Sequence, residues 1–414
     1  MGKQENLKKR NHAVSCTYFI DGDGGNDSNP GTSSEAPWKT LKKAGDRHYG
    51  PGDRILLKRG CRWTDPFVLS GSGTAEKPIE LSTYGEGPRP VIAAEDTRKG
   101  ICLTLNNVSD WKISSLELKQ AKIGLYLRYT DFRGHSNINI SDCLFQDMPD
   151  RSADANFHNQ EFAWSSGIFI GGILPEKKIT VLKNLTIRSN RFVNAGIGII
   201  HNWYWPDQPR FNILTNVVLE NNIAENCYGG GFAFTDTSDL SIRNFEIRNS
   251  GGKSDFGTTG AFLQSCRNVV IENCLFEGTR AIDCHDGAGM DFEGNNRQVL
   301  FRNNRVQNNH GPGILFCCTD GVNEEIEITD NHISGNGASP HDRDYACGLL
   351  NWTDRNEKEI FGKNKGRIKG NTIISRNSCL PFSAGTARAG VPFEWDGFEI
   401  TGNRLLSSEE TDRT

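Results

Sequence analysis

The sequence lacks several features that would assign it to a common class. Hydrophobic residues make up only 36% of the chain, Met occurs three times, and no apolar run approaches the length of a membrane span. Acidic residues slightly outnumber basic ones, and the net charge of −4 argues against non-specific nucleic-acid binding. Gly is abundant instead, with 45 of 414 residues, which favours many short strands joined by turns.

Cysteine is present, but not in a pattern that indicates a metal module. The 12 Cys form no paired CxxC elements, so a zinc site is not expected. Cys143, Cys227 and Cys274 fall at or near repeat positions, which favours buried small residues over disulfides. The sequence has no GxSxG motif, and Cys317-Cys318 has no evident activating partner, so neither points to a nucleophilic enzyme.

The N-terminus carries no visible export signal. Residues 1–17 are expected to be disordered or tag-like, because the first 15 residues are charged and lack the apolar segment of a signal peptide. We expect a secreted or periplasmic protein whose signal is not visible in this sequence, with a cytoplasmic location as the alternative.

Residues 18–78 are expected to form an N-terminal cap and the first strands. A short strand at 18–22 leads into Asp23–Ser34, which is rich in Gly, Asn and Pro and predicts a loop. A short helix is predicted from Ser34 to Ala44, since Trp38, Leu41 and Ala44 form one apolar stripe.

Residues 79–414 are expected to form one repeat domain. One recurring phrase places an aliphatic or aromatic residue three positions before a small, polar or apolar one. Seven of the nine steps between successive phrases measure 23–32 residues, and two steps of 47 and 40 residues indicate insertions, as in a solenoid. The second members of the phrase are Leu116, Cys143, Asn190, Asn222, Phe245, Cys274, Asn304, Asn331, Asn371 and Asn403. The six Asn among them are expected to stack on successive coils and to satisfy turn backbone.

A second phrase begins with Gly and alternates, as in Gly289-Met290-Asp291-Phe292-Glu293. Period-two alternation predicts a strand with one face inward, and no helix intervenes between successive strands. These strands therefore favour a parallel β-helix over a βαβ fold. The expected inward pairs are Ile168/Ile170, Ile197/Ile199, Phe232/Phe234, Ala261/Leu263, Met290/Phe292 and Ile314/Phe316.

Two stretches carry a family resemblance. Asp21–Leu41 (DGDGGNDSNPGTSSEAPWKTL), followed by Pro51–Arg54, resembles the N-terminal plug of right-handed parallel β-helix proteins of carbohydrate-active type. The Gly and Asn phrases from about residue 100 to 405 resemble the pectate-lyase-like superfamily. The resemblance implies an all-β, single-stranded right-handed parallel β-helix with a short N-terminal capping helix. It does not name a reaction, because that superfamily includes hydrolases, lyases, epimerases and non-catalytic binders.

Two acids mark the candidate site. Asp291 and Glu293 both point outward from one strand, at positions where the other coils carry apolar or neutral residues. Their Cα atoms are expected roughly 6.5–7 Å apart, within the roughly 6.5–9.5 Å that suits an inverting glycoside hydrolase. Mutual repulsion would keep one of them protonated as the acid. Asp286 and Asp236 are the alternates, and a pair of merely solvated acids is the competing interpretation.

Further residues are expected to bind a poly- or oligosaccharide substrate. Polar and aromatic side chains near the same surface suit sugar hydroxyls and ring faces, although each His alone is more often structural. The substrate-binding candidates are His285, His310, His201, Trp203, Gln264 and Trp352. The long insertions, with residues 157–161 and 341–345, are expected to form walls of a groove.

Two other functions remain open at this point. A polysaccharide lyase would need a base and a cation, for which Lys253 and Arg280 are candidates; Asp255, Asp283 or Asp286 would then bind Ca²⁺. A non-catalytic carbohydrate-binding solenoid is the other alternative. For the preferred hydrolase no metal or cofactor is expected, and the sequence does not set the oligomeric state.

Overall fold

The structure is a computed structural model. It describes residues 15–131, 133–149, 165–172, 179–201, 212–253, 257–282, 284, 286–318, 321–338, 345–353, 364–376, 379–386 and 395–408. Within these ranges, no helix has both the length and the apolar character needed to cross a membrane.

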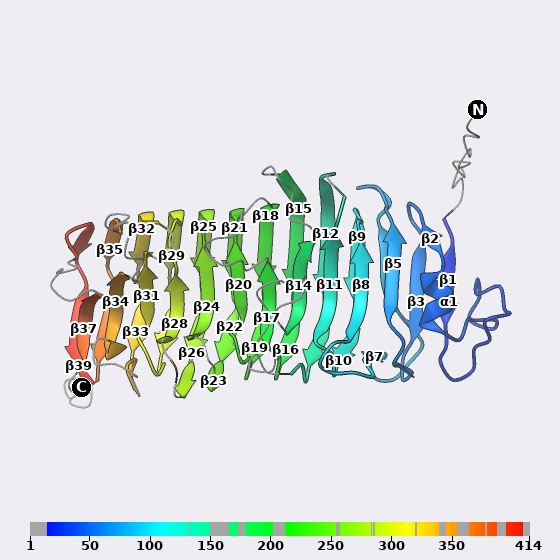
Figure 1. The fold of residues 1–414 in the computed structure, drawn as a ribbon, viewed down its shortest axis with the longest axis horizontal. Helices are drawn as coiled ribbons and strands as arrows, with labels where there is room; N and C mark the ends of the chain where they lie inside the picture. Colours follow the sequence, from blue (N-terminus) through cyan, green and yellow to red (C-terminus); the bar gives the residue numbers. More distant parts are fainter. Residues whose placement is uncertain are drawn as a thin grey trace.

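The chain winds into an elongated stack of coils, with the N-terminal cap at one end and the last strands at the other (Figure 1). Each full coil contributes one strand to each of three parallel sheets, here called sheets A, B and C. In a typical coil the chain runs from sheet C to sheet A to sheet B, as in β28, β29 and β30, before β31 starts the next coil in sheet C. This architecture is the predicted parallel β-helix.

Sheet A contains β1 (Thr17–Ile20), β3 (Arg54–Lys58), β6 (Ile79–Tyr84), β9 (Trp111–Ser114), β12 (His135–Ser141), β15 (Ile179–Arg188), β18 (Asn212–Glu220), β21 (Thr237–Arg243), β25 (Arg267–Glu272), β29 (Arg297–Arg302), β32 (Glu324–Thr329), β35 (Gly366–Lys369) and β38 (Phe398–Thr401). Sheet B contains β4 (Arg62–Trp63), β7 (Val91–Ala93), β10 (Glu117–Lys119), β13 (Leu144–Gln146), β16 (Arg191–Val193), β19 (Ile223–Glu225), β22 (Glu246–Arg248), β26 (Leu275–Glu277), β30 (Arg305–Gln307), β33 (His332–Ser334), β36 (Thr372–Ser375) and β39 (Arg404–Ser407). Sheet C contains β2 (His48–Tyr49), β5 (Phe67–Gly71), β8 (Ile101–Asn106), β11 (Ile123–Tyr129), β14 (Ser166–Gly172), β17 (Ile197–His201), β20 (Phe232–Thr235), β24 (Thr258–Gln264), β28 (Asp286–Phe292), β31 (Ile314–Cys317), β34 (Cys347–Thr353) and β37 (Leu380–Thr386). A further parallel pair joins β23 (Gly251–Lys253) to β27 (Arg280–Ile282).

The N-terminal cap contains a shorter helix than the sequence predicts. Helix α1 spans Leu41–Gly45, and the Thr40 side chain caps it by accepting a hydrogen bond from the Lys43 N–H at 3.1 Å. Trp38 lies before the helix and stacks on Tyr18 with 5.1 Å between ring centroids. The coils also begin earlier than Ile79, because β3, β4 and β5 already pair with later strands of the three sheets.

The expected asparagine ladder is present and buried. Asn304 Nδ2 donates to Asn331 Oδ1 at 3.1 Å, and the ladder continues to Asn371 and Asn403 with Nδ2–Oδ1 distances of 2.9 Å. Each Asn also bonds to backbone of the preceding coil, as Asn304 does with Ile271 O and Cys274 N–H. Cys143, Cys227 and Cys274 are buried as predicted, and none of the 12 Cys forms a disulfide.

The outer face of sheet C differs from the prediction in one respect. Many of its outward residues are buried rather than exposed, and the apolar ones form two clusters outside the main core. The N-terminal cluster includes Ile123, Tyr126, Phe169, Ile197, Ile200, Ala233 and Phe262, so Ile197 faces outward and not inward as expected. The C-terminal cluster includes Ala288, Leu315, Tyr345, Cys347 and Leu350. Asp291 lies between them, because it pairs with Phe262 on one side and Leu315 on the other.

Candidate active site

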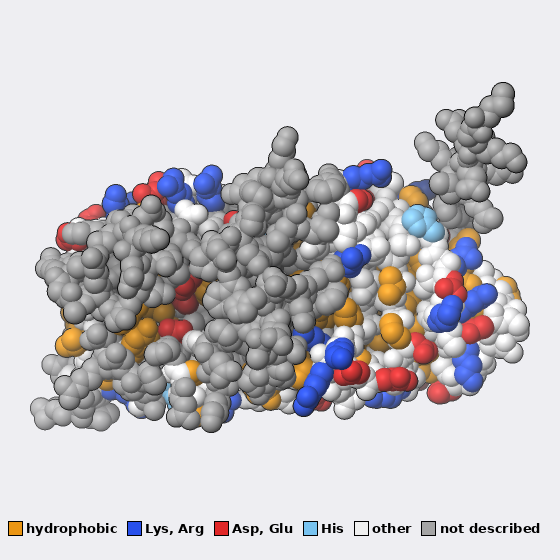
Figure 2. Space-filling model, viewed as in Figure 1, with side chains coloured by type: hydrophobic (Ala, Val, Ile, Leu, Met, Phe, Trp, Pro, Cys, Tyr) orange, Lys and Arg blue, Asp and Glu red, His pale blue; other side chains and the backbone are white. Residues whose placement is uncertain are grey.

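The strand register assembles the outward row that the alternation predicts. The Glu293 N–H donates to Leu263 O at 2.9 Å, which extends the pairing of β24 with β28 and places Glu293 beside Gln264. Gln264 pairs in turn with Thr235. On the other side of Glu293, Cys317 pairs with Trp352. Figure 2 shows acidic side chains adjoining hydrophobic ones over this part of sheet C.

Asp291 is a buried carboxyl with an unusual environment. Its side chain is 3% exposed, and no group in the described part of the chain hydrogen-bonds its Oδ1. Burial raises the pKa of Asp291 well above its ordinary value, and the negative charges of Glu293 and Asp286 and a hydrogen bond with Glu293 raise it further. The raised pKa favours the protonated form of Asp291, which can donate a hydrogen bond to Glu293.

This contact changes the geometry expected for the acid pair. The prediction assumed two side chains standing parallel, with their carboxyl groups as far apart as their Cα atoms. The hydrogen bond between Asp291 and Glu293 brings the carboxyl groups together instead, so no water or sugar fits between them. The carboxyl groups of Asp291 and Glu293 are therefore hydrogen-bonded neighbours, and the separation predicted for an inverting pair does not apply to them.

Asp286 is a third acid close to Asp291. It opens β28 in a left-handed conformation, with a φ of 71°, and the register between β24 and β28 shifts at Thr258 and Thr259. Its side chain lies over Gly257, where a Cβ atom would sit only 1.4 Å from Oδ2. This bulge turns Asp286 toward the site, close enough for its charge to raise the pKa of Asp291.

Two aromatic residues flank the acids on their C-terminal side. The Tyr345 hydroxyl lies 3.4 Å from Asp286 Oδ1, and its ring packs against Trp352 with 5.5 Å between centroids. Burial, followed by the charge of Asp286, raises the pKa of Tyr345, so the hydroxyl keeps its proton. The expected groove wall at 341–345 thus contributes Tyr345, although the sequence did not indicate its contact with Asp286; residues 341–344 and 157–161 lie outside the described residues.

His310 also lies at this end of β28. Its Nδ1 is 3.3 Å from Ala281 O, and its Cβ packs against Gly287, the residue after Asp286. The structure therefore brings His310 to the vicinity of Asp286. The other two predicted partners here, His285 and Trp203, lie outside the described residues.

His201 takes a different place from the one expected. Its side chain is fully buried, and it pairs with Ile170 and Phe234 of the inward row. Its Nδ1 lies 2.6 Å from Thr235 O, and burial lowers the pKa of His201 to about 4. The expectation that it binds sugar is wrong, because a neutral imidazole in the core cannot reach a ligand on the outer face. Extending the alternation from Ile199 by two residues would have placed it inward.

Asp236 and Gln264 are both buried at the same edge of sheet C. Asp236 follows β20 in a left-handed conformation, and its N–H donates to Gln264 O at 3.2 Å. Asp236 thus lies two strands from β28, roughly 10 Å away. Gln264 lies one strand away, beside Glu293.

Of the residues considered for a lyase, Asp286 lies close to Asp291, whereas Arg280 and Lys253 make their described contacts elsewhere. Arg280 donates from Nη2 to Asn249 O at 3.1 Å, on the turn after β22. Lys253 ends β23 and pairs with Ile282 of β27. Asp255 and Asp283 lie outside the described residues. No basic group is among the causes of the raised Asp291 pKa; these are burial and two acids.

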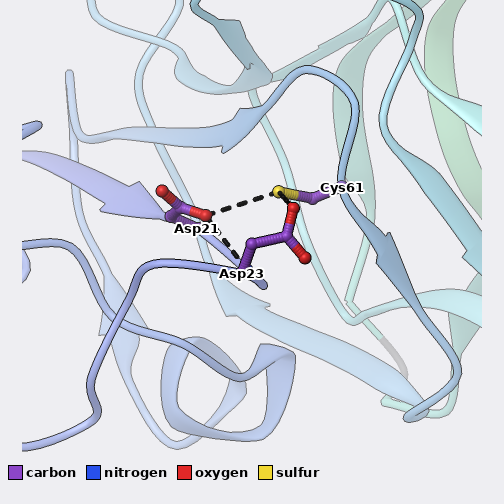
Figure 3. Close-up of side chains that lie close together, drawn as sticks. All are labelled: Asp21, Asp23 and Cys61. Carbon is purple, nitrogen blue, oxygen red and sulfur yellow. Dashed lines mark hydrogen bonds between the residues drawn. The ribbon is translucent and has the colours of Figure 1, made fainter.

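One cluster with metal-ligand chemistry lies in the N-terminal cap. Asp21, Asp23 and Cys61 bring their donor atoms together (Figure 3). Asp21 Oδ1 already accepts hydrogen bonds from the Asp23 and Gly24 N–H groups, and Oδ2 accepts from Lys58 Nζ at 2.6 Å. Burial raises the pKa of the Cys61 thiol, which disfavours the thiolate that a metal needs. These hydrogen bonds stabilise a turn, which is the structural role of the cluster.

Cys317 and Cys318 lie beside the acids but do not suit catalysis. Both are buried, and burial raises the pKa of Cys318 to about 12. A thiol that keeps its proton is a poor nucleophile.

Comparison with known proteins finds similar sequences and similar folds. A lacto-N-biosidase from Bifidobacterium longum subsp. longum is 24% identical over 318 residues, which are 62% of this chain and 19% of that protein. The crystal structure of a GH136 lacto-N-biosidase from Eubacterium ramulus superposes with a TM-score of 0.64 at 15% identity, covering 94% of this chain and 68% of that one. A PL6 family alginate lyase gives a TM-score of 0.50 at 14% identity, covering 95% of this chain and 52% of that one.

The chain spans about a fifth of the length of the Bifidobacterium protein, and the structural similarities describe the fold. The family described as "Right handed beta helix region" matches residues 96–364, which include every acid of the candidate site. This chain is a member of the right-handed β-helix family.

Proposed function

We propose that this protein is a glycoside hydrolase that cleaves an oligo- or polysaccharide over the outer face of sheet C. The observation that supports this most strongly is the burial of Asp291 beside the half-buried Glu293, which together with Asp286 raises the pKa of Asp291. A carboxyl group with a raised pKa is what a glycosidase needs to protonate the leaving oxygen. The similarity to lacto-N-biosidases makes such an activity the first to test.

In the proposed reaction the Asp291–Glu293 unit delivers one proton to the glycosidic oxygen as the bond to the anomeric carbon breaks. Asp286 is the second carboxylate, which accepts a proton from the attacking water. Asp286 lies five positions before Asp291 on the same strand, at most about 17 Å away along an extended chain. We propose inversion at the anomeric carbon, which needs carboxyl groups roughly 6.5–9.5 Å apart with a water between substrate and base.

A polysaccharide lyase is the second candidate, because the fold also occurs in an alginate lyase. A lyase must neutralise a uronate carboxylate, and the negative charges of Glu293 and Asp286 would repel that group. The described residues around Asp291 favour the hydrolase. A non-catalytic solenoid would not need a strained Asp286 beside a protonated acid, although it would use the same aromatic wall.

The experiment is to incubate the protein with a panel of neutral and uronate-containing oligosaccharides and to measure new reducing ends and ultraviolet absorbance together. Hydrolysis gives reducing ends alone, whereas elimination also gives an absorbing unsaturated sugar. NMR of the first product formed reports inversion or retention. Activity should fall as the pH rises through the elevated pKa of Asp291, because the proton donor is then lost.

Variants connect the activity to the site. Asp291→Asn, Glu293→Gln and Asp286→Asn should each abolish most turnover, while Glu327→Gln on the outer side of sheet A serves as a control at a half-buried acid. Full activity in folded Asp291→Asn and Glu293→Gln proteins would refute the proposed mechanism.

A further inference from the structure

A cleft lies on sheet B, away from the acids on sheet C. It measures about 680 Å³ and lies over β22, β26 and β30, which are neighbours in the sheet. The residues that shape it are Glu246, Arg248, Asn273, Leu275, Asn303 and Arg305. The coil that contains the acid-bearing strand β28 also contains β30, so the cleft and the acids lie on different sides of the same part of the solenoid.

The register explains why the surface is hollow here. Glu246, Leu275 and Arg305 occupy the same outward position on three neighbouring strands. Leu275 is shorter than the two charged side chains and only half-buried, so it forms an apolar floor between two polar walls. The strands lie about 4.8 Å apart, so the walls stand on either side of a channel one strand wide.

Hydrogen bonds hold the walls in place before any ligand arrives. Arg248 pairs with Glu277 and, at 3.2 Å, with Glu246. Gln307 Nε2 donates to Glu277 Oε1 at 2.6 Å, and its Oε1 accepts from Arg305 Nη2 at 3.1 Å. Side chains that are already ordered lose less conformational entropy when they bind a ligand.

Two amides on the rim keep their hydrogen-bonding groups available. The equivalent Asn244 donates to Asn221 in the preceding coil at 3.0 Å. Asn273 and Asn303 continue the same turn position with similar positive φ values, but neither side chain makes a hydrogen bond to the described part of the chain. The Arg305 guanidinium also has no ion-pair partner within those residues, and its side chain is exposed.

We infer that this cleft is a second, non-catalytic site for a neutral oligosaccharide. A sugar ring has an apolar face, which Leu275 can cover, and hydroxyl groups, which two carboxamides and a guanidinium can bind. The charge of Arg248 is balanced by its ion pairs with Glu246 and Glu277, so the surface carries both signs of charge, which favours an uncharged ligand. The choice of ligand class rests on the proposed function; the cleft itself does not.

The test is isothermal titration calorimetry of the full chain with neutral hexasaccharides (cellohexaose, maltohexaose and a β-linked galactohexaose) and with hexagalacturonate. The variant Leu275→Glu places a charge on the floor, and Glu already occupies the equivalent position at residue 246. We expect this variant to weaken binding of a neutral hexasaccharide at least about tenfold, and Arg305→Ala about fivefold. Chromatography before and after titration shows whether the sugar stays intact.

Arg404→Ala is the matched control, because Arg404 holds the same outward position three coils further on. It should bind as the unmodified chain does. Unchanged affinity in Leu275→Glu, or binding of hexagalacturonate alone, would overturn the inference. A chain that binds at the cleft yet cleaves nothing would contradict the proposed hydrolase and leave the cleft established, whereas Leu275→Glu should keep full turnover of a short substrate.

Discussion

The asparagine ladder and the acid of β28 bury polar groups in opposite ways. Asn304 is 1% exposed and Asp291 is 3% exposed, so water reaches neither. Asn304 has partners for both side-chain atoms, in Asn331, Ile271 and Cys274. Asp291 has an Oδ1 with no partner among the described residues, and two acids next to it. The first arrangement stabilises the scaffold, whereas the second costs stability and raises the pKa of the acid.

The largest effect should come from replacing the acids of this comparison, Asp291 and its neighbour Glu293. Asp291→Asn and Glu293→Gln should each lower the rate of glycosidic cleavage by about 10²–10⁴-fold, because general acid catalysis contributes that much. Initial rates on the best substrate of the panel measure it. Substrate affinity should change far less than the rate, and a loss confined to affinity would instead indicate a binding role.

The next effect should come from breaking the ladder. Asn304→Ala leaves the Cys274 N–H and Ile271 O buried without partners, which should cost about 2–4 kcal/mol. The midpoint of urea unfolding measures this loss. Asn304→Cys should cost less, since Cys274 fills the equivalent place and its Sγ accepts from the Phe245 N–H.

A neighbouring residue provides the control for the ladder. Asn303 is exposed, and its side chain makes no hydrogen bond within the described chain. Asn303→Gly keeps the left-handed turn, so the free energy of unfolding should change by less than about 0.5 kcal/mol. Equal losses at residues 303 and 304 would contradict the role given to the ladder.

Asp291→Asn should also raise stability at neutral pH. The folded state raises the pKa of Asp291 above its ordinary 3.8, so the folded protein binds more protons and loses stability as the pH rises above that value. Asn cannot ionise and still donates to Glu293. We expect the melting temperature to rise by roughly a few degrees at pH 7.

The gain should vanish below about pH 4, where Asp291 is protonated in both folded and unfolded chains. Thermal melts of both proteins across the acid range test this dependence. A gain that persists in acid would mean that packing, and not the proton, is responsible.

The smallest effect is expected from Tyr345→Phe. The hydroxyl lies 3.4 Å from Asp286 Oδ1, a long contact that contributes little energy. Cleavage should slow by about two- to fivefold, and the basic limb of the pH–rate profile should move slightly. Trp352→Phe, which keeps an aromatic ring against Tyr345, serves as the comparison.

The repeated phrases were enough to predict the scaffold. A two-residue alternation and a coil-length step fix which residues stack, so the phrase members from Cys143 to Asn403 align along one corner of the solenoid. The same register correctly placed Glu293 beside Gln264 and Cys317. These are local properties of each coil, and parallel stacking repeats them.

The site was predicted less completely, because it depends on contacts that do not repeat. The hydrogen bond between Asp291 and Glu293 depends on side-chain torsions, and the turn of Asp286 depends on a register shift at Thr258. The burial of Phe262 and Leu315 on the outer face has no signal in the alternation, which distinguishes only two faces of a strand. Tyr345 reaches Asp286 from 59 residues away.

Each rung of the ladder joins residues only one coil apart, 27 positions for Asn304 and Asn331 and 32 for Asn371 and Asn403. Parallel sheets usually fold slowly, because strands that are distant in sequence must find one another. Here every finished coil offers three strand edges and a row of amides to the next segment of chain. The protein can therefore fold by growth from one end, with a nucleus of a few coils.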